Sequence, residues 1–297
     1  MKPPSGSLED TDLSKLRFPL IASPKLDGLR ASVQNGQLLS STLKLIPNLY
    51  LQKKFGKPEF EGLDGELIEG EPNTDPFNRT TSACMSIDGE PDGVRLWVFD
   101  KFMTDTDYEH RLLEALGQVV LYGDVAANPF TIVNNLAGLR KFEAECIAEG
   151  YEGMMMRKPT GLYKQGRSTM SDQGLLRRKP FSDGEAVILG AVEAQENTNE
   201  ATKNELGRTK RSSAKAGKVG KGTLGKYNVV GLTVFPGVKF DITAWGDMAQ
   251  RQEQWDVRDS LVGKILKFKY QKYGSKDAPR LPIPLGFRDA MDITTDV

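Results

Sequence analysis

Short apolar runs separated by turn residues make up much of the first hundred positions of the chain. The pair Asn35-Gly36 and the triplet Pro91-Asp92-Gly93 lie between such runs. Short apolar runs bounded by Gly, Pro, Asn and Asp are typical of β-strands joined by turns. We therefore expect antiparallel strands at residues 20–22, 29–33, 65–68 and 95–99.

Helical periodicity replaces this pattern in two later stretches. Apolar positions recur at three- and four-residue spacing in residues 108–121 and 136–149, which predicts two amphipathic helices. Strand-like runs then return at residues 186–189, 226–235 and 265–270.

These patterns predict two domains. An α+β domain is expected over residues 1–182, and a β-rich domain over residues 183–297, with a hinge at residues 179–184. Residues 195–225, between the first two strands of the second domain, are rich in Gly, Ser and Lys. This composition predicts a loop or long hairpin outside the core.

One segment of the chain differs from the rest in its charge. The chain has 40 basic and 40 acidic residues, so its formal net charge is zero and no overall field favours a nucleic acid. Residues 203–226 are the exception, since eight basic residues and one acid fall within them. A partner that carries phosphates is therefore expected at this segment. The eight are Lys203, Arg208, Lys210, Arg211, Lys215, Lys218, Lys221 and Lys226.

Cysteine and histidine are too scarce for several classes of site. Cys84 and Cys146 lie far apart without metal-ligand spacing, which fits a reducing compartment and no disulfide framework. His110 is the one histidine of the sequence and has charged neighbours, so a Ser-His triad or a zinc cluster is disfavoured and an exposed side chain is expected. With no secretory signal and no apolar run long enough to span a membrane, the chain is expected to be soluble and cytoplasmic, in the host cell if its source is viral.

Candidate chemistry begins with Lys25, which follows the first apolar run and precedes the turn pair Asp27-Gly28. A lysine amine attacks phosphorus only when it is neutral, so nucleophilic lysines are found where burial or nearby cations favour the neutral form. The alternative is a surface lysine beside an ordinary Asp-Gly turn.

Acidic, aromatic and basic positions follow on predicted strands. Asp64 and Glu66 are two residues apart and thus on one strand face, which suits Mg²⁺ or ribose hydroxyls. Phe99 ends an apolar run and is suited to stacking on a nucleobase, although core packing is the alternative. Arg177 and Lys179 are two residues apart, so they point to the same side of a predicted strand, where they would neutralise a phosphate. The alternative is a basic strand at a solvated sheet edge.

The order of these elements, from the lysine through the acidic, aromatic, Glu152-Gly153 and basic strands, resembles the covalent nucleotidyltransferase superfamily. That superfamily comprises ATP-dependent DNA ligases, RNA ligases and mRNA capping enzymes. The resemblance implies an adenylyltransferase domain of ATP-grasp-like antiparallel sheets with flanking helices, followed by an OB-fold β-barrel.

Residue roles follow from the same resemblance. Lys25 matches the residue that is adenylylated through a lysyl-N phosphoramidate. Asp64, Glu66 and Glu152 match carboxylates that hold metal or nucleotide. The nucleotide-binding positions of the family fall on Asp27, Arg30, Glu66, Phe99, Glu152, Arg177 and Lys179.

The chain departs from the family pattern at three positions. Ser23 replaces a glutamate that DNA ligases often have two residues before the nucleophile. Ser41 is followed by Thr42 where a Ser-Arg element is usual, and Lys44 is the candidate to replace the missing arginine at the DNA. Arg177 stands where lysine is usual, and arginine keeps the charge but differs in geometry.

Two C-terminal features favour a DNA ligase among these enzymes. Residues 261–270 and 279–289, ending in Arg288-Asp289, resemble the closing part of a ligase OB domain. The basic segment lies where small viral ligases carry a DNA-encircling loop. The expected DNA contacts are Lys44, Arg208, Lys210, Arg211, Lys215, Lys218 and Lys221.

The sequence therefore resembles a small, bacteriophage-type ATP-dependent DNA ligase. The resemblance implies ATP and Mg²⁺, with Mn²⁺ as an alternative, and a monomer that seals nicked duplex DNA through lysyl-AMP and DNA-adenylate. An RNA ligase, a capping guanylyltransferase and a non-catalytic nucleic-acid-binding relative stay open as alternatives.

Overall fold

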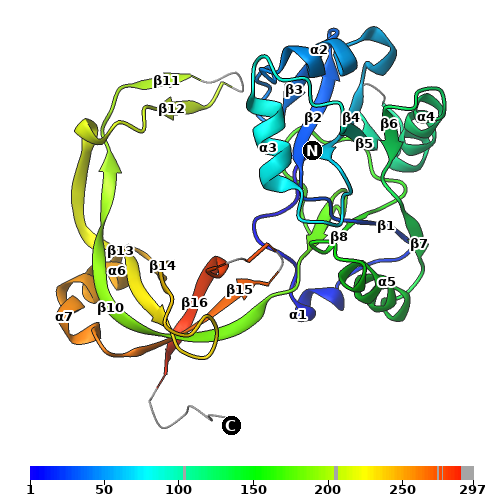
Figure 1. Ribbon diagram of the computed structural model, residues 1–297. Coiled ribbons are helices and arrows are strands. Elements are labelled where there is room, and N and C mark those ends of the chain that lie inside the picture. The colour runs from blue at the N-terminus through cyan, green and yellow to red at the C-terminus, as the bar shows by residue number, and fades with distance from the viewer. Residues whose placement is uncertain (103–104, 204–206, 273, 276, 289–297) are drawn as a thin grey trace. The chain divides into compact units, whose positions relative to one another are not determined.

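The computed structural model describes residues 1–102, 105–203, 207–272, 274–275 and 277–288 (Figure 1). The chain divides into two compact units, Met1–Lys179 and Pro180–Val297. Both are built largely from antiparallel strands with a few helices, so the predicted α+β class is confirmed. No helix of the described residues is long and apolar enough to cross a membrane.

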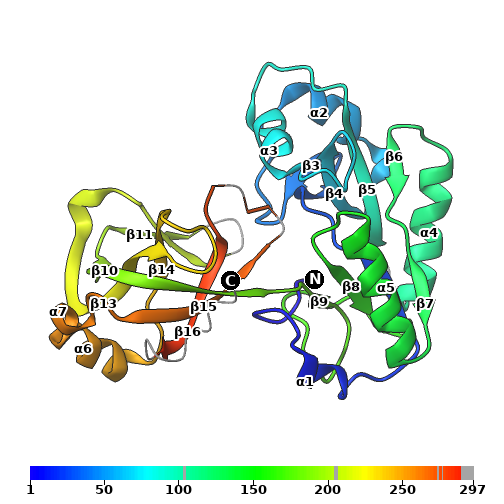
Figure 2. The ribbon, with the colours of Figure 1, turned by 60° about the horizontal axis from the view of Figure 1, so that its bottom comes forward.

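The first sheet of the first unit has the strand order β7-β1-β8-β9, and every pairing in it is antiparallel. Two helices, α1 and α5, supply Leu13, Leu139 and Cys146 to the core under this sheet, and α5 lies against β1 and β7 (Figure 2). The bounds are α1 Asp10–Leu13, β1 Leu20–Pro24, β7 Thr131–Val133, α5 Leu136–Ala148, β8 Met154–Arg157 and β9 Leu176–Arg178.

The second sheet of this unit has the order β3-β2-β4-β5-β6. Its pairings are antiparallel except that between β5 and β6, which is parallel and is joined through helix α4. The bounds are β2 Leu29–Gln34, β3 Gln37–Ser40, α2 Leu49–Phe55, a 3₁₀ turn Pro58–Phe60, β4 Leu63–Glu69, α3 Phe77–Met85, β5 Val94–Lys101, α4 Tyr108–Val120 and β6 Val125–Ala127.

The second unit contains a five-stranded antiparallel sheet of order β14-β13-β10-β15-β16. A separate two-stranded hairpin, β11 with β12, continues from the far ends of β10 and β13 (Figure 1). The bounds are β10 Ser182–Asn197, β11 Ala201–Lys203, β12 Thr209–Arg211, a 3₁₀ turn Lys215–Gly217, β13 Lys218–Gly231, β14 Lys239–Thr243, α6 Met248–Asp256, α7 Arg258–Leu261, β15 Ile265–Gln271 and β16 Arg280–Arg288.

The edge strands of this sheet, β14 and β16, are not joined by a hydrogen-bonded ladder in the described residues, so no closed barrel is formed there. Side chains nevertheless bring the two edges together. Trp245, two residues after β14, has its ring centroid 5.5 Å from that of Phe287 on β16.

Both predicted helices are confirmed at their first residues, because a polar side chain caps each one. Asp107 Oδ1 accepts from the amide of His110 at 3.1 Å before α4. Asn135 Oδ1 accepts from the amide of Gly138 at 2.8 Å before α5. Such side chains satisfy amides that the first helical turn leaves without partners.

Candidate nucleotide site around Lys25

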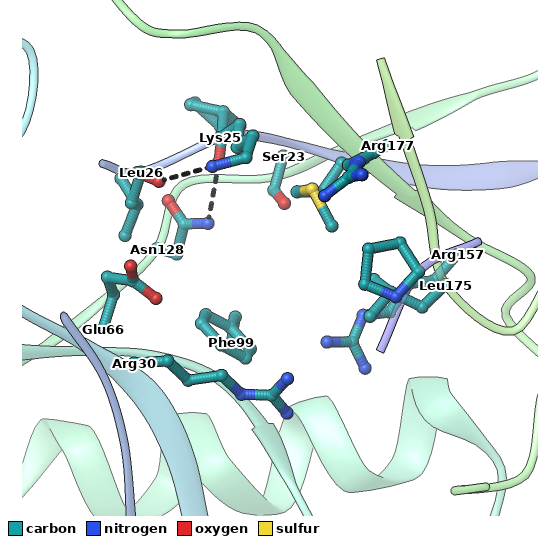
Figure 3. Close-up of a pocket in the computed structure, with 13 residues that line it drawn as sticks. Ser23, Lys25, Leu26, Arg30, Glu66, Phe99, Asn128, Arg157, Leu175 and Arg177 are labelled. Atoms are coloured by element: carbon teal, nitrogen blue, oxygen red, sulfur yellow. Dashed lines mark hydrogen bonds between the residues drawn. The ribbon is translucent and has the colours of Figure 1, made fainter. Parts of the chain in front are cut away.

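A pocket of about 190 Å³ lies between the two sheets of the first unit (Figure 3). Strand β1 and its following turn contribute from one side, and strands β2, β4 and β5 from the other. The lining residues are Pro3, Ser23, Pro24, Lys25, Leu26, Arg30, Glu66, Phe99, Asn128, Met155, Arg157, Leu175 and Arg177.

Lys25 is the first residue after β1, and its backbone is fixed by the neighbouring strand. Its amide donates to the carbonyl of Gly153 at 2.8 Å. Gly153 has a φ of 151°, and a Cβ there would lie 2.3 Å from the carbonyl oxygen of Arg178. Only glycine fits such a position. The close approach of the backbone at Gly153 to that at Arg178 therefore explains why a glycine follows Glu152.

One carboxylate, that of Glu152, serves two lysines. Glu152 Oε2 accepts from the amine of Lys25, and Oε1 accepts from the amine of Lys179. The Glu152 side chain is 1% exposed, whereas those of Lys25 and Lys179 are 19% and 11% exposed. The buried charge is therefore paired on both oxygens, as burial requires.

Glu66 is a second carboxylate beside Lys25. Its Oε1 accepts from the amide of Gly28 at 3.2 Å. Burial raises the pKa of Glu66 to about 7, although the charges of Lys25 and Arg30 oppose this shift. Glu66 thus lines the pocket as a group that titrates near neutral pH.

Asp64 faces Arg30 instead of the open pocket. Arg30 donates from Nε to Oδ1 at 2.9 Å and from Nη2 to Oδ2 at 2.5 Å, and Tyr163 donates to Oδ2 at 3.0 Å. Burial raises the pKa of Asp64, but the Arg30 charge and hydrogen bonds outweigh burial and lower it overall. Both oxygens of this predicted metal ligand are therefore engaged.

Phe99 lies at the pocket wall with two guanidinium groups near its ring (Figure 3). Arg30 is 5.8 Å and Arg157 is 5.5 Å from the ring centroid. Such distances allow cation–π attraction. The ring is half-buried, so it is available to a ligand in the pocket.

The basic strand β9 alternates as the sequence predicts. Arg177 lines the pocket and donates from Nε to the carbonyl of Gly6 at 2.7 Å. Burial lowers the pKa of Arg177, and Glu152 opposes this. Arg178 points to the other side, where its Nε donates to Glu143 at 2.6 Å.

The carboxylates around Lys25 fit a cation that is shared with a ligand, not a protein-built metal cage. Among the residues that the structure describes, no group of three or more His, Cys, Asp or Glu side chains is arranged to hold a metal ion. Mg²⁺ commonly takes one or two carboxylates together with substrate phosphates. Glu66 lines the pocket and meets this requirement, whereas Asp64 is paired with Arg30 and Tyr163, and both oxygens of Glu152 accept from lysines.

Other predicted site residues lie in different surroundings. Asp27 is buried at the turn after Lys25, and Lys44 is exposed between β3 and α2. Asp289, the end of the predicted closing motif, lies outside the described residues. The remaining predicted DNA contacts are all exposed in the hairpin and its flanks: Arg208, Lys210, Arg211, Lys215, Lys218 and Lys221.

Two polar residues of the pocket lining were not singled out from the sequence. Arg157, at the end of β8, is 5% exposed and pairs with Asp100. Asn128 donates from Nδ2 to the carbonyl of Pro24 at 3.2 Å and so holds the segment before Lys25 (Figure 3). Arg157 directly follows three methionines on β8, and a charged residue at the end of an apolar run was the available signal for the arginine. No such signal marks Asn128.

Comparison with known proteins places this geometry in a family. No protein-family model and no curated protein sequence matches the chain. Solved structures do match. The DNA ligase-adenylate of Chlorella virus is 30% identical, with 97% of this chain and 98% of that chain covered and a TM-score of 0.51. A Lig E DNA ligase is 22% identical, with 91% and 93% covered and a TM-score of 0.68. Pmar-Lig is 19% identical, with 97% and 67% covered and a TM-score of 0.68.

The two structures with the lower sequence identity show a shared fold, and one of them is a Lig E DNA ligase. The identity to the Chlorella virus enzyme extends over nearly the whole of both chains. The chain therefore belongs to the ATP-dependent DNA ligases, and the family that its motifs resemble is confirmed.

Proposed function

We propose that this DNA ligase seals nicks in duplex DNA through a covalent adenylate on Lys25. The observation that carries the proposal is the position of the Lys25 amine at the pocket, on a carboxylate that also binds Lys179. A nucleophile, its counter-ion and a second cation thus meet where a nucleotide phosphate would lie.

In the first step, the Lys25 amine attacks the α-phosphorus of ATP in line. The ammonium group first releases one proton to solvent, the N–P bond forms as the bond to the bridging oxygen of pyrophosphate breaks, and the nitrogen then loses a second proton. Glu152 Oε2 is the carboxylate oxygen in contact with this amine, so it holds the amine and is placed to accept the proton. Lys179 and Arg177 neutralise charge on the phosphate.

The purine and ribose are held by the pocket walls. Phe99 stacks on the base, since it is the aromatic ring that lines the pocket. Arg30 and Glu66 are positioned for the ribose or phosphate, with Arg30 fixed by Asp64. Mg²⁺ held by Glu66 and the nucleotide phosphates would supply positive charge for the departing pyrophosphate.

The AMP then passes to the 5′-phosphate of a nick, and the adjacent 3′-OH displaces it. We place the DNA contacts of these steps on Lys44 and on the basic hairpin, whose side chains are exposed and positively charged. Contacts of this kind bind the phosphate backbone without reading sequence.

We further propose that the second unit is an OB fold. Its five antiparallel strands and the approach of β14 to β16 through Trp245 and Phe287 support this assignment. We also propose that the protein is a monomer in the cytoplasm, where the buried thiols of Cys84 and Cys146 stay reduced.

The Lys25→Ala variant tests the chemistry directly. We expect wild-type protein incubated with α-labelled ATP and Mg²⁺ to carry an acid-labile label on denaturing gels. Lys25→Ala removes the attacking nitrogen, so its label falls to background. Wild-type protein, but not this variant, is then expected to seal a nicked duplex.

Lys15→Ala is the matched control, because Lys15 is a 61% exposed lysine of the same unit paired with Asp12. It should label as wild type does. A label from GTP alone would indicate a capping enzyme, and sealing of nicked RNA but not DNA would indicate an RNA ligase. Folded wild-type protein that is free of bound AMP and takes no label would contradict the proposal.

A further inference from the structure

Arg111 is a fully buried cation outside the pocket. Its side chain is 0% exposed, and it is absent from the described residues that line the pocket. It lies in the first turn of α4, next to the exposed His110. Charged side chains are almost never fully buried unless they are paired, so its partners indicate its purpose.

The guanidinium group of Arg111 joins three segments. Nε donates to Asp100 Oδ1 at 2.8 Å, at the end of β5. Nη1 donates to the carbonyl of Thr106 at 2.7 Å and to that of Gly161 at 3.0 Å. The end of β5, the turn before α4 and the segment after β8 are therefore held by one planar group.

A first route leads from Arg111 to the pocket through Asp100. Asp100 is 0% exposed, and its Oδ2 accepts from Arg157 and lies 3.5 Å from Arg111 Nη2. A single buried carboxylate thus sets the spacing of two guanidinium groups. Of these, Arg157 lines the pocket and lies beside the ring of Phe99.

A second route leads through Tyr163. The Arg111 guanidinium lies 5.5 Å from the centroid of the Tyr163 ring. The Tyr163 hydroxyl donates to Asp64, which holds Arg30 through two hydrogen bonds. Arg30 also lines the pocket and lies near the ring of Phe99.

From this connectivity we infer that Arg111 is a positioning residue for nucleotide binding, which acts through Arg157 and Arg30 without touching the nucleotide. The inference rests on the proposed use of the pocket for ATP. Buried ion pairs contribute little net stability compared with apolar replacements, but they fix geometry. Lysine cannot replace Arg111, because one ammonium group cannot reproduce the planar fork toward a carboxylate and two carbonyls.

A double-mutant cycle tests the inference. The rate of adduct formation on Lys25 is measured against ATP concentration in the wild type, in Arg111→Lys, in Arg157→Lys and in the double variant. We expect Arg111→Lys to lower the ratio of maximal rate to half-saturating ATP about ten- to a hundredfold, mainly by raising the half-saturating concentration. The double variant should lose less than the product of the two single losses.

Arg79→Lys is the matched control. Arg79 lies in α3 of the same unit and donates to the backbone carbonyls of Glu69, Glu71 and Thr74, none of which lines the pocket. It should leave both kinetic parameters unchanged. Circular dichroism and thermal unfolding check that each variant is folded. If Arg111→Lys does not fold, Arg111→Met takes its place in the cycle.

Wild-type kinetics in Arg111→Lys would overturn the inference. So would losses that multiply both in this double variant and in one that combines Arg111→Lys with Arg30→Lys, because Arg111 would then act independently of both arginines. In both cases the wild-type adduct still forms and the proposed function stands. A wild-type protein that forms no adduct would instead contradict the proposed function itself.

Discussion

At the scale of single residues, Glu66 is a carboxylate that lines the pocket and whose ionisation is altered by its surroundings. Its pKa is raised from 4.5 to about 7, with burial as the largest cause. Between these two pH values the folded state binds more protons than the unfolded state. The free energy of unfolding therefore falls as the pH rises through this window, and the loss is complete above about pH 7.

Glu66→Gln is expected to remove this loss. The amide keeps the size of the side chain and an oxygen for the Gly28 amide, but it carries no charge to bury. In EDTA and without nucleotide, the variant should match the wild type near pH 4.5 and exceed its free energy of unfolding at pH 8 by up to about 3 kcal/mol. Urea denaturation at the two pH values measures the free energy of unfolding of both proteins. An equal difference between variant and wild type at both pH values would contradict burial of the Glu66 charge as the cause.

The order of motifs in the sequence pointed to Lys25, Glu152 and Lys179 as candidates, and the fold brings these three side chains into one contact network. The order of motifs did not point to Arg111 or Arg157. Arg111 lies among charged and polar neighbours on an amphipathic helix, where a sequence pattern predicts a solvated arginine. Its burial depends on Asp100, eleven residues away, and on the carbonyl of Gly161, fifty residues away. The apolar periodicity of the sequence gives no information on either contact.

At the scale of elements, the turn between β1 and β2 depends on Gly28. A Cβ at this position would lie 2.1 Å from the carbonyl oxygen of Leu67 and 2.9 Å from Cγ1 of Ile68. The turn that carries Lys25 is therefore packed against the backbone of β4. This contact explains why a glycine follows Asp27, independently of any turn type.

Gly28→Ala is expected to lower the free energy of unfolding of the first unit by about 1–3 kcal/mol, since either the turn or β4 must move. Adduct formation on Lys25 should fall with it. Urea denaturation measures the first effect. Gly123→Ala is the control, because a Cβ at Gly123 meets no atom within 4 Å, and a loss as large in this variant would contradict the packing argument.

The basic hairpin is an element whose charge is expected to act through counterion release. Replacing both Lys210 and Arg211 by glutamine should lower the slope of log Kobs for nicked DNA against log salt by about 0.9 for each phosphate that the variant no longer neutralises. Fluorescence anisotropy at several NaCl concentrations measures the slope. Lys239→Gln, at an exposed lysine on β14, is the control. An unchanged slope in the hairpin variant would show that these residues do not contact DNA phosphates.

Strands β1, β2, β4 and β5 and helices α4 and α5 were predictable, because each has a regular apolar period and a turn or cap at its end. The lengths of β10 and β13 were not. These strands extend to Asn197 and from Lys218, where the sequence is polar and Gly-rich. Their pairing continues there through backbone hydrogen bonds and through bulges such as that at Glu193, which leave no apolar pattern. The parallel β5–β6 pair was also missed, since a three-residue strand has too few positions to show a period.

At the scale of the whole molecule, each unit has its own hydrophobic core. The buried clusters of the first unit contain residues such as Leu63 and Leu20, and that of the second contains residues such as Phe268. We expect calorimetry to show two unfolding transitions. In Lys25→Ala protein, ATP at a hundred times its Kd should stabilise only the first unit, by about 2.7 kcal/mol. A single transition that shifts as a whole would contradict independent unfolding of the units.

Lys179 is both the last residue of the first unit and an ion-pair partner of Glu152, whose other oxygen accepts from the Lys25 amine. The next strand, β10, begins three residues later at Ser182. The backbone of Lys179 itself is held within the first unit, because its amide donates to Ser7 Oγ at 2.7 Å and its carbonyl accepts from the same hydroxyl at 3.2 Å. Under the proposed chemistry, the junction between the units therefore begins at a residue that is fixed beside Lys25. A substitution that stiffens or lengthens residues 180–181 is expected to change the rate of the later steps of nucleotide transfer and to leave the Glu152 ion pairs in place.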